Sequence, residues 1–565
     1  MKKTISVMIA ALAAGAWAEP KAEWIEREKA VFAAQPEKGR RACWFDIGSD
    51  KPGAIAKCGE PVEFEVRTLY MGGEESVPFG DVSVKVTNFG RKILAQTVYN
   101  LETCQVFKVS VKLDEPGFIS CSCIRKSVVG QQEWGSWTVG VEPERIGTAS
   151  ERPADFDRFW DEAIASLDKT TPIDVQVEKV DRYSSADFAS YCIGVASFNG
   201  RRTWGYLSLP TKPGKYPVRI NVPGAGQGWT GFRKGGAAIF LTMNVFDFKY
   251  DWNDGKRHKE LYDDMLKRWE TKYRTRNAWG GLWQAGIGVS REEYFYYGAI
   301  LGINRILNWV CTEPKEVFAE GVTIDRAKVD YSGQSQGGAF GLFLAGLNTN
   351  ITSAVISEPA LTGLLFDQKD MAAGWPYVVV SQTSPEAKAN ARKFASYFDG
   401  AHFAPRIRCK VRMGAGFTDG VCPPHCIYSA YNALGRDVDR HMTHGLGCSH
   451  GGPRGRYNEY EAMLGDWNGT FRIATITADR AKARYACGET ATFRIRPAFA
   501  WGKGTVTLSD ADGKAVAPAI EVDCAKQKEA VVSGKLDKPG TLRVRFQKRA
   551  VTGEAASSEL EAVYE

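Results

Sequence analysis

Residues 330–341 read DYSGQSQGGAFG, with a single serine, Ser335, between Gly333 and Gly337. The residues before it, AKVDYSG, predict a strand, and those after it, GAFGLFLAGL, predict a helix. A strand that turns sharply into a helix strains the turn residue and leaves no room for neighbouring side chains, so flanking glycines let a serine stand exposed above a sheet. The stretch therefore predicts a nucleophilic serine in a strand–turn–helix. The alternative is a serine in an ordinary glycine turn.

The surrounding chain has the pattern of a sheet covered by helices. Residues 216–226, YPVRINVPGAG, predict a buried strand that runs into a glycine loop, and residues 291–310 carry apolar side chains at helical spacing. Strands that alternate with longer helices favour a parallel sheet. We therefore expect an α/β domain over residues 150–468, with a doubly wound, mostly parallel sheet.

A serine needs a base to remove its proton and an acid to orient that base, and in this type of fold the chain order is serine, acid, histidine. Three of the six histidines fail on order or spacing: His258, His402 and His425. The segment 440–452, RHMTHGLGCSHGG, supplies the others. His450, flanked by small residues, is the predicted base, and the alternatives are His444 and, less favoured, His441.

The predicted acid is Asp419. Residues 408–424, RCKVRMGAGFTDGVCPP, give an apolar strand and a glycine turn before it, where a strand-end carboxylate belongs. The competing carboxylate is Asp399, which lies in a predicted helix before that strand and for which a surface role is expected.

Charge that develops on an attacked carbonyl oxygen needs backbone N–H donors. One donor is expected from Gln336, the residue after the nucleophile, and another from Ala225 in the glycine loop NVPGAGQGW, residues 221–229. A glycine turn that binds nothing is the alternative for this loop.

Two short motifs occur twice, once on each side of the α/β domain. CGEPVEFEVR from Cys58 recurs as CGETATFRIR from Cys487, and KLDEPG from Lys112 recurs as KLDKPG from Lys535, in the same order and at similar spacing. Short alternating runs bounded by turn residues predict small antiparallel, Ig-like β-sandwich modules over residues 19–145 and 469–565. One disulfide per module is a further hypothesis: Cys58 with Cys104, and Cys487 with Cys524.

Composition excludes several classes of protein. The chain has 565 residues, 44% hydrophobic and 25% charged, and a net charge of +7 without a Lys/Arg block, which does not favour nucleic-acid binding. Residues 1–18 predict a secretory signal cleaved after Ala18, and no later segment is long and apolar enough to span a bilayer. The 13 cysteines lack the spacing of a zinc site, so we expect no bound metal. The signal at residues 1–18 predicts that the protein is exported.

Several ordered motifs resemble a known family, the acetyl xylan esterases and cephalosporin C deacetylases of carbohydrate esterase family 7. The resemblance covers about residues 150–455 and rests on RPADFDRFW (152–160), GRRTWGYLSLP (200–210), SQGG (335–338), SYFDGAHFAPRIRCKV (396–411), DGVCPP (419–424) and AYNALG (430–435). It implies an α/β-hydrolase fold, a catalytic triad with no cofactor, and an oxyanion hole. The residues that match are Ser335, Asp419 and His450 for the triad, and Ala225 and Gln336 for the oxyanion hole.

The chain departs from the family pattern near the predicted acyl pocket. Where the family has Arg-Gly-Gln after its next strand, residues 244–256 read NVFDFKYDWNDGK, and Pro223, Gly224 and Ala225 replace its His-Gly-Tyr. Gly451 stands where the family tends to carry a glutamate after the histidine.

An aromatic-rich insertion, residues 249–288, looks particular to this chain. It places Leu261, Met265, Trp269 and Tyr273 on one helical face. Packing of this face onto the sheet is the favoured interpretation. The alternative is a rim on which aromatic side chains, with Trp279 and Trp283 as candidates, stack against sugar rings.

The sequence as a whole favours an exported serine esterase that removes acetyl groups from an acetylated polysaccharide or oligosaccharide. Two other functions stay open: a serine peptidase or different esterase on the same fold, and a non-catalytic glycan-binding surface protein.

Overall fold

The computed structural model describes residues 20–35, 40–51, 54–71, 75–226, 231–235, 237–250, 255–273, 281–445, 448–450, 474–480, 483–497, 503–523, 527, 529–549 and 555–565. The predicted signal peptide therefore lies outside the described residues. The chain divides into two compact units. The first holds residues 1–143, 416–418 and 444–565, and the second holds residues 144–415 and 419–443.

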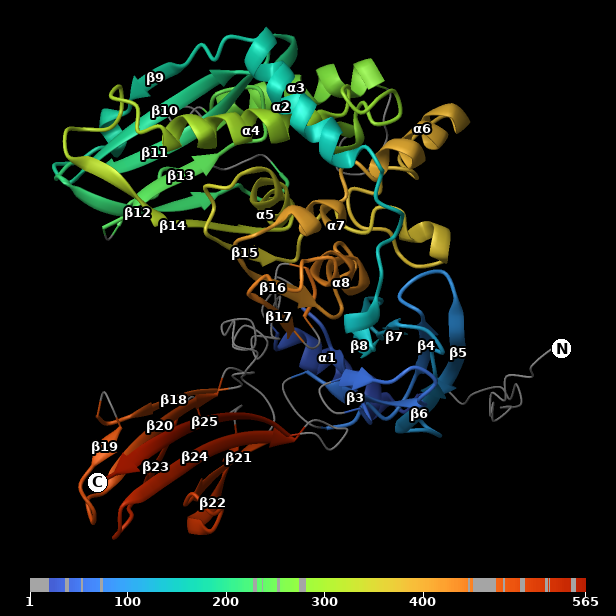
Figure 1. The fold of residues 1–565 in the computed structure, drawn as a ribbon. Helices are drawn as coiled ribbons and strands as arrows, with labels where there is room; N and C mark the ends of the chain where they lie inside the picture. The colour runs from blue at the N-terminus through green and yellow to red at the C-terminus, as the bar shows by residue number, and fades with distance from the viewer. Residues whose placement is uncertain are drawn as a thin grey trace. The chain divides into compact units, whose positions relative to one another are not determined.

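The described residues in the N-terminal part of the first unit form two sheets and the helix α1 (Ala22–Ala33) (Figure 1). A three-stranded sheet has the order β1 (Cys43–Ser49), β3 (Val62–Tyr70), β6 (Val106–Val111). A five-stranded sheet has the order β2 (Ile55–Ala56), β8 (Gln132–Val141), β7 (Gly117–Lys126), β4 (Asp81–Thr87), β5 (Ile93–Asn100). Only the β2–β8 pair is parallel.

The C-terminal part of the first unit repeats this topology strand for strand. Its three-stranded sheet has the order β18 (Ala474–Ala478), β20 (Ala491–Pro497), β23 (Ala530–Gly534). Its five-stranded sheet has the order β19 (Arg484–Tyr485), β25 (Ala555–Tyr564), β24 (Gly540–Arg549), β21 (Lys503–Ser509), β22 (Ala515–Asp523), and again only the first pair, β19–β25, is parallel. Two sheets with the same order in both copies are the structural counterpart of the sequence repeat.

The repeated motifs contact each other in the same way in both copies. The N–H of Gly59 donates to the Leu113 carbonyl at 2.6 Å, and the N–H of Gly488 donates to the Leu536 carbonyl at 2.7 Å. Gly59 and Gly488 have φ angles of 78° and 85°, which favour glycine. The recurring residues therefore form the same turn contact between CG and KLD in each copy.

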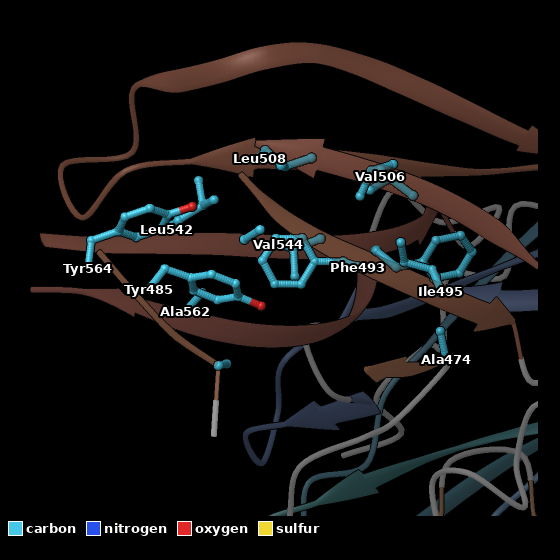
Figure 2. Close-up of a cluster of buried hydrophobic side chains, with 14 of the residues drawn as sticks. Ala474, Tyr485, Phe493, Ile495, Val506, Leu508, Leu542, Val544, Ala562 and Tyr564 are labelled. Atoms are coloured by element: carbon cyan, nitrogen blue, oxygen red, sulfur yellow. The ribbon is translucent and has the colours of Figure 1, made fainter. Parts of the chain in front are cut away.

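Apolar side chains from both sheets share one core in the C-terminal copy (Figure 2). Phe493 and Ile495 of β20 lie in the same buried cluster as Val506 of β21 and Val544 of β24, and all four are fully buried. The alternating burial along β20 explains why its sequence alternates apolar and polar residues.

The hypothesis of a Cys58–Cys104 disulfide is wrong for this structure. Cys104 is a thiol whose Sγ donates to the Val106 carbonyl at 3.3 Å. Cys487 is also a thiol, directed to the Glu565 carbonyl, and its suggested partner Cys524 lies outside the described residues. The spacing of cysteines along the sequence did not contain the side-chain directions that decide pairing.

Helix α1 is attached to the N-terminal sheets through a buried ion pair. Arg125 donates to both carboxylate oxygens of Glu28, at 3.1 and 2.6 Å, and these two side chains are 1% and 0% exposed. The N–H of Val128 donates to the same carboxylate at 2.8 Å. Because a buried charge is costly without its partner, this pair fixes where α1 lies on the sheet.

The second unit is built on a nine-stranded sheet with the order β17-β16-β15-β14-β12-β13-β11-β10-β9. The strands span β9 (Gln176–Lys179), β10 (Phe188–Ala196), β11 (Arg202–Pro210), β12 (Gly214–Asn221), β13 (Ile239–Met243), β14 (Val322–Gln334), β15 (Ser353–Ser357), β16 (Lys410–Gly416) and β17 (Arg440–Gly445). Pairing is parallel from β13 through β12, β14 and β15 to β16, and antiparallel among β13, β11, β10 and β9. The predicted α/β class is confirmed.

The helices of this unit are α2 (Phe156–Thr170), α3 (Gly255–Tyr273), α4 (Phe295–Cys311), α5 (Gln336–Leu347), α6 (Pro385–Ala395), α7 (Gly400–Phe403) and α8 (Pro424–Asn432). Helix α4 packs on β10 and β11, α5 packs on β14 and β15, and the two helices contact each other, so both lie on one face of the sheet (Figure 1). No helix among the described residues is long and apolar enough to cross a membrane.

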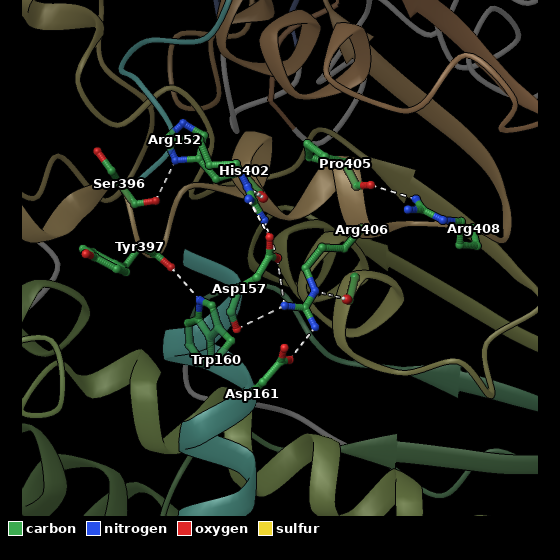
Figure 3. A network of polar contacts seen from close by, with 11 residues as sticks. Arg152, Asp157, Trp160, Asp161, Ser396, Tyr397, His402, Pro405, Arg406 and Arg408 are labelled. Atoms are coloured by element: carbon green, nitrogen blue, oxygen red, sulfur yellow. Dashed lines mark hydrogen bonds and ion pairs between the residues drawn. The ribbon is translucent and has the colours of Figure 1, made fainter. Parts of the chain in front are cut away.

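A polar network ties α2 to the segment before β16 (Figure 3). Asp157 of α2 pairs with Arg152 at 2.6 Å and with Arg406 at 3.0 Å. Arg406 also donates to the Gly346 carbonyl near the end of α5, at 2.9 Å, and Arg152 donates to the His402 carbonyl at 2.9 Å. The stretches 152–160 and 396–411, which carried much of the family resemblance, are therefore in contact and support the helix that follows Ser335.

Candidate active site

Ser335 lies where the sequence predicts it, between the end of β14 and the start of α5. Its φ and ψ angles are 58° and −121°, a conformation that costs a non-glycine residue about 1–3 kcal/mol. The surrounding backbone holds it there: the Ser335 N–H donates to the Ser357 carbonyl at 3.0 Å, and its own carbonyl accepts from Ala339 and Ala360 at 3.0 and 2.9 Å. The turn is the strained strand-to-helix geometry that presents a nucleophile.

The glycines around this turn are required by close backbone approaches. An added Cβ at Gly337 would lie 2.1 Å from the Val222 carbonyl oxygen, and one at Gly333 would lie 2.4 Å from the Gly337 carbonyl oxygen. At Gly338 an added Cβ would lie 2.7 Å from the Ser357 carbonyl oxygen. No larger residue fits at these positions without moving backbone, which is the physical reason for the SGQSQGG pattern.

The predicted oxyanion loop lies beside the turn. A Cβ built on Gly224 would lie 3.9 Å from the Cβ of Ser335. The Gln336 amide donates to the carbonyls of Pro223 and Gly224 at 3.2 and 3.4 Å. Gln336 is fully buried, whereas Ala225, the next residue of the loop, is exposed. The side chain of Gln336 therefore fastens the loop to the turn, a role that the sequence prediction, limited to its backbone N–H, did not include.

Tyr296, in the first turn of α4, completes this arrangement. Its hydroxyl donates to the Gln336 Oε1 at 2.7 Å, and burial holds the pKa of the Tyr296 hydroxyl well above its ordinary value. The hydroxyl therefore stays a neutral donor, and it fixes which way the Gln336 amide points. Nothing in the local sequence pattern distinguished this tyrosine from its neighbours.

Asp419 is fully buried at the carboxyl end of the sheet, in the turn after β16. Its Oδ1 accepts the N–H groups of Val421 and Cys422 at 2.8 and 2.9 Å. The Cys422 thiol is in hydrogen-bonding contact with the Ser335 side chain. The structure thus places both Ser335 and Asp419 in contact with Cys422.

The environment of Cys422 keeps its thiol protonated. Burial, and next the negative charges of Asp419 and Glu358, hold the pKa of Cys422 well above its ordinary value. A thiol in this state is a poor nucleophile. The hydroxyl of Ser335 therefore has no competing thiolate beside it.

Glu358 is a buried carboxylate that sequence reasoning missed. It follows β15, has a φ angle of 42° and is 3% exposed. The Gln334 amide donates to its Oε2 at 2.8 Å. The sequence did contain one signal: Glu358 directly follows the strand that neighbours the one leading to Ser335. The carboxyl ends of parallel strands lie at one edge of a sheet, so this position indicates a carboxylate near Ser335.

His450, the predicted base, is half-buried and belongs to the first unit, whereas Ser335 and Asp419 belong to the second. Its catalytic pairing with Asp419 stays a prediction. Of the alternatives, His444 is half-buried with its ring 5.3 Å from that of Phe417, in the first unit, and His441 is half-buried in the second.

Asp399 is not a surface residue, which corrects the expectation for the competing acid. It is 2% exposed and caps α7 by accepting from the Ala401 N–H at 3.0 Å. Its carboxylate also accepts the N–H groups of Gly363 and Leu364. Three buried backbone donors explain why a carboxylate is placed here.

Two of the histidines excluded by chain order or spacing are buried structural groups. His402 bonds to the carbonyls of Ser396 and Ser150 at 2.7 and 3.1 Å. His425 bonds through Nε2 to the Ala372 carbonyl at 2.7 Å, and burial lowers its pKa to about 4.

The aromatic insertion is partly core and partly cavity lining. Met265 of α3 is fully buried, as expected for a packed face, while Leu261 borders a cavity of about 570 Å³. Trp283 is 2% exposed and packs against Trp375 and Tyr296, so its suggested contact with sugar is wrong. Trp279 lies outside the described residues.

Comparison with known proteins gives a family match over most of the second unit. The family model described as acetyl xylan esterase (AXE1) matches residues 144–445. The acetyl esterase Axe7A of Xylanibacter ruminicola is 30% identical over 394 residues, which cover 67% of this chain and 81% of that protein.

The solved structures that match the chain include two acetyl xylan esterases. The enzyme of Paenibacillus sp. R4 is 23% identical with a TM-score of 0.42 and covers 57% of this chain and 96% of that one. Acetyl xylan esterase 1 of Thermoanaerobacterium sp. JW/SL YS485 is 20% identical with a TM-score of 0.42 and covers 55% of this chain and 93% of that one. On the family match and the 30% identity, the chain belongs to the acetyl xylan esterase family and is a carboxylic ester hydrolase.

Proposed function

We propose that this protein is an exported serine esterase that removes acetyl groups from an acetylated polysaccharide or its oligosaccharides, with Ser335, His450 and Asp419 as its triad. The observation that carries the proposal is the strained Ser335 turn, with Asp419 and the Gly224 loop beside it. The acetyl group is supported by the name of the relative, an acetyl esterase, and the glycan by the name of the family.

In the proposed reaction, the Ser335 Oγ attacks the acetyl carbonyl while His450 takes the proton of the Ser335 hydroxyl. The tetrahedral oxyanion is stabilised by the backbone N–H groups of Gln336 and Ala225. His450 then gives its proton to the departing sugar oxygen, which leaves an acetyl–Ser335 ester. Water, deprotonated by His450, attacks that ester; His450 then returns the proton to the departing Ser335 oxygen, which releases acetate and the free serine.

Backbone contacts within the first unit place residues 417 and 418 beside the segment that carries the candidate bases His444 and His450. The N–H of Thr418 donates to the Cys448 carbonyl at 2.9 Å, and the N–H of Phe417 donates to the Gly445 carbonyl at 3.0 Å. Asp419 directly follows Thr418 in the chain, and His450 is two residues beyond Cys448. Because His444 directly precedes Gly445, this ladder supports both candidate histidines, and the small residues that flank His450 favour it over His444.

Export and the role of the flanking parts belong to the same proposal. The pattern of residues 1–18 supports a signal peptide cleaved after Ala18. The paired three- and five-stranded sheets support two Ig-like sandwich modules, one on each side of the esterase domain in the chain.

The test is acetate release from acetylated xylan and from 4-nitrophenyl acetate. Wild type should release acetate from both, and Ser335→Ala, His450→Ala and Asp419→Asn should lower kcat about 10³-fold or more. His444→Ala is the matched control and should keep most of the activity, provided that circular dichroism shows every variant folded.

Three results would contradict parts of the proposal. Activity of Ser335→Ala on either ester would exclude Ser335 as the nucleophile. Loss of activity in His444→Ala but not in His450→Ala would move the base to His444. Hydrolysis of 4-nitrophenyl acetate without release from acetylated xylan would leave a serine esterase but refute xylan as its substrate.

A further inference from the structure

A second cavity lies at the same edge of the sheet as Ser335. The strand register aligns Ser332 of β14 with Asn221 of β12, and Thr242 of β13 with Tyr206 of β11. Strands β12, β13 and β14 run in the same direction, and β11 runs in the opposite direction. The edge of the sheet where β12, β13 and β14 end is therefore the edge where β11 begins. Arg201 therefore lies on the edge that carries Ser335, three strand spacings or about 14 Å along the sheet.

The cavity at this position has a volume of about 310 Å³, within the range of small-ligand pockets. The side chains that matter for its chemistry come from four segments: Arg201 before β11, Asp247 after β13, Arg268, Trp269 and Tyr273 of α3, and Glu293 before α4. All of them are among the described residues.

Two half-buried aromatic rings form one wall. The rings of Trp269 and Tyr273 stack with centroids 5.3 Å apart and an interplanar angle of 26°. The Arg201 guanidinium lies over the Trp269 ring, 5.0 Å from its centroid. Aromatic side chains that are neither fully buried nor isolated, next to fixed polar groups, suit a ligand with both an apolar face and hydroxyl groups.

The charges around the cavity balance among the described residues that line it. Arg201 and Arg268 lie 3.9 and 3.4 Å from the two oxygens of Asp247, and Lys272 lies 2.9 Å from Glu293, which also accepts from the Tyr273 hydroxyl. Glu292 is the remaining charged group and pairs with Arg291 outside the lining. Three cations and three carboxylates favour an uncharged ligand that accepts and donates hydrogen bonds.

One helix turn connects the cavity to the Ser335 turn. Tyr297 and Gly298 line the cavity, and Tyr296, their neighbour in α4, holds the amide of Gln336. A ligand in the cavity is therefore adjacent to the element that orients the oxyanion loop. A chain of sugars can span the distance of about 14 Å between Ser335 and the cavity. A single acetylated sugar bound at Ser335 cannot.

We propose that this cavity is a distal subsite that binds an uncharged sugar unit of the glycan chain whose acetyl group is removed at Ser335. The inference rests on the proposed function, since it takes the glycan to be the substrate. It predicts that the enzyme prefers acetylated oligosaccharides to acetylated monosaccharides, and that the preference depends on Trp269 and Arg268.

The kinetic test compares acetate release from acetylated xylohexaose and from acetylated xylose. In wild type, kcat/KM should be higher for the hexaose. In Trp269→Ala and Arg268→Met this advantage should fall about tenfold, because truncation of a tryptophan or arginine that contacts the ligand has an effect of this size. Lys259→Ala is the matched control, since it removes an exposed charge of α3 that pairs only with Asp263 among the described residues, and it should keep the wild-type ratio.

A binding test separates this proposal from the proposed function. Calorimetric titration of Ser335→Ala with unacetylated xylohexaose should show binding, and the added Trp269→Ala change should weaken it about tenfold. If wild type hydrolyses 4-nitrophenyl acetate but neither sugar ester, the proposed substrate is wrong while this titration still decides the subsite. Equal hexaose preference in wild type and both cavity variants, or equal binding with and without Trp269, would overturn the subsite.

Discussion

Asp399 and Asp419 show how two buried aspartates of the same domain can serve different purposes. Asp399 accepts three backbone N–H groups. In Asp399→Asn the amide nitrogen would face one of these donors, so we expect the free energy of unfolding to fall by about 1–3 kcal/mol. Urea unfolding measures this, and kcat on 4-nitrophenyl acetate should stay near wild type. A large loss of kcat in a folded Asp399→Asn protein would contradict a purely structural role.

His425 makes the stability of the esterase domain depend on pH. Its pKa is about 4 in the folded state, lowered by burial, against about 6.5 when unfolded. Above pH 6.5 both states are neutral and there is no penalty. As the pH falls from 6.5 to 4 only the unfolded state gains the proton, so stability should fall by up to about 3 kcal/mol and level off below pH 4.

His425→Gln is the variant that isolates this effect, because a glutamine amide can donate to the Ala372 carbonyl without titrating. Its Tm should change less between pH 7 and pH 5 than the Tm of wild type. The same Tm shift in both proteins would show that other groups cause the acid sensitivity.

At the scale of elements, the position of α5 depends on its glycines. A Cβ on Gly338 would lie 2.7 Å from the Ser357 carbonyl oxygen and 2.8 Å from the Pro359 Cα. Gly338→Ala must therefore push α5 away from the end of β15, and we expect a loss of esterase activity together with a destabilisation of about 1–3 kcal/mol. Gly147→Ala is the control, since an added Cβ there meets nothing within 4 Å. Full activity in Gly338→Ala would contradict this packing.

Local pattern was sufficient for the elements around Ser335 and insufficient for their neighbours. The strand, the turn and α5 follow from glycine and apolar spacing within twelve residues, because backbone crowding in the turn is a local property. Glu358, Tyr296 and the inward packing of Trp283 depend on which distant segments meet, and one sequence does not contain that information. The same limit explains the misjudged Asp399, whose three donors come from two segments.

At the scale of the whole molecule, we expect the cysteines to stabilise the fold by packing in the core and not by forming disulfides. Every cysteine that the structure describes is a thiol, and most are buried. We therefore expect the same Tm with and without dithiothreitol, measured by scanning calorimetry. A fall of several degrees in the reduced protein would show that an exported form gains at least one disulfide in an oxidising compartment.

The repeat was predictable at this scale as well, but only in part. The CG and KLD motifs recur because they form the same turn contact in each copy. Outside these motifs, the eight strands of one copy have little sequence in common with the eight strands of the other. Matching order in both copies, down to the short parallel strands β2 and β19, follows from the structure alone.

Two copies of one strand order in a single chain also raise a question of timing. A strand of one copy has a counterpart in the other, and exchange of such counterparts during folding is a known failure of repeated domains. About 330 residues separate Val141 from Ala474, so at a synthesis rate of about 5–20 residues per second the ribosome needs roughly 15 to 70 seconds between the copies. The esterase domain thus delays synthesis of the second copy, so the chain of the first copy is complete before a rival set of strands exists.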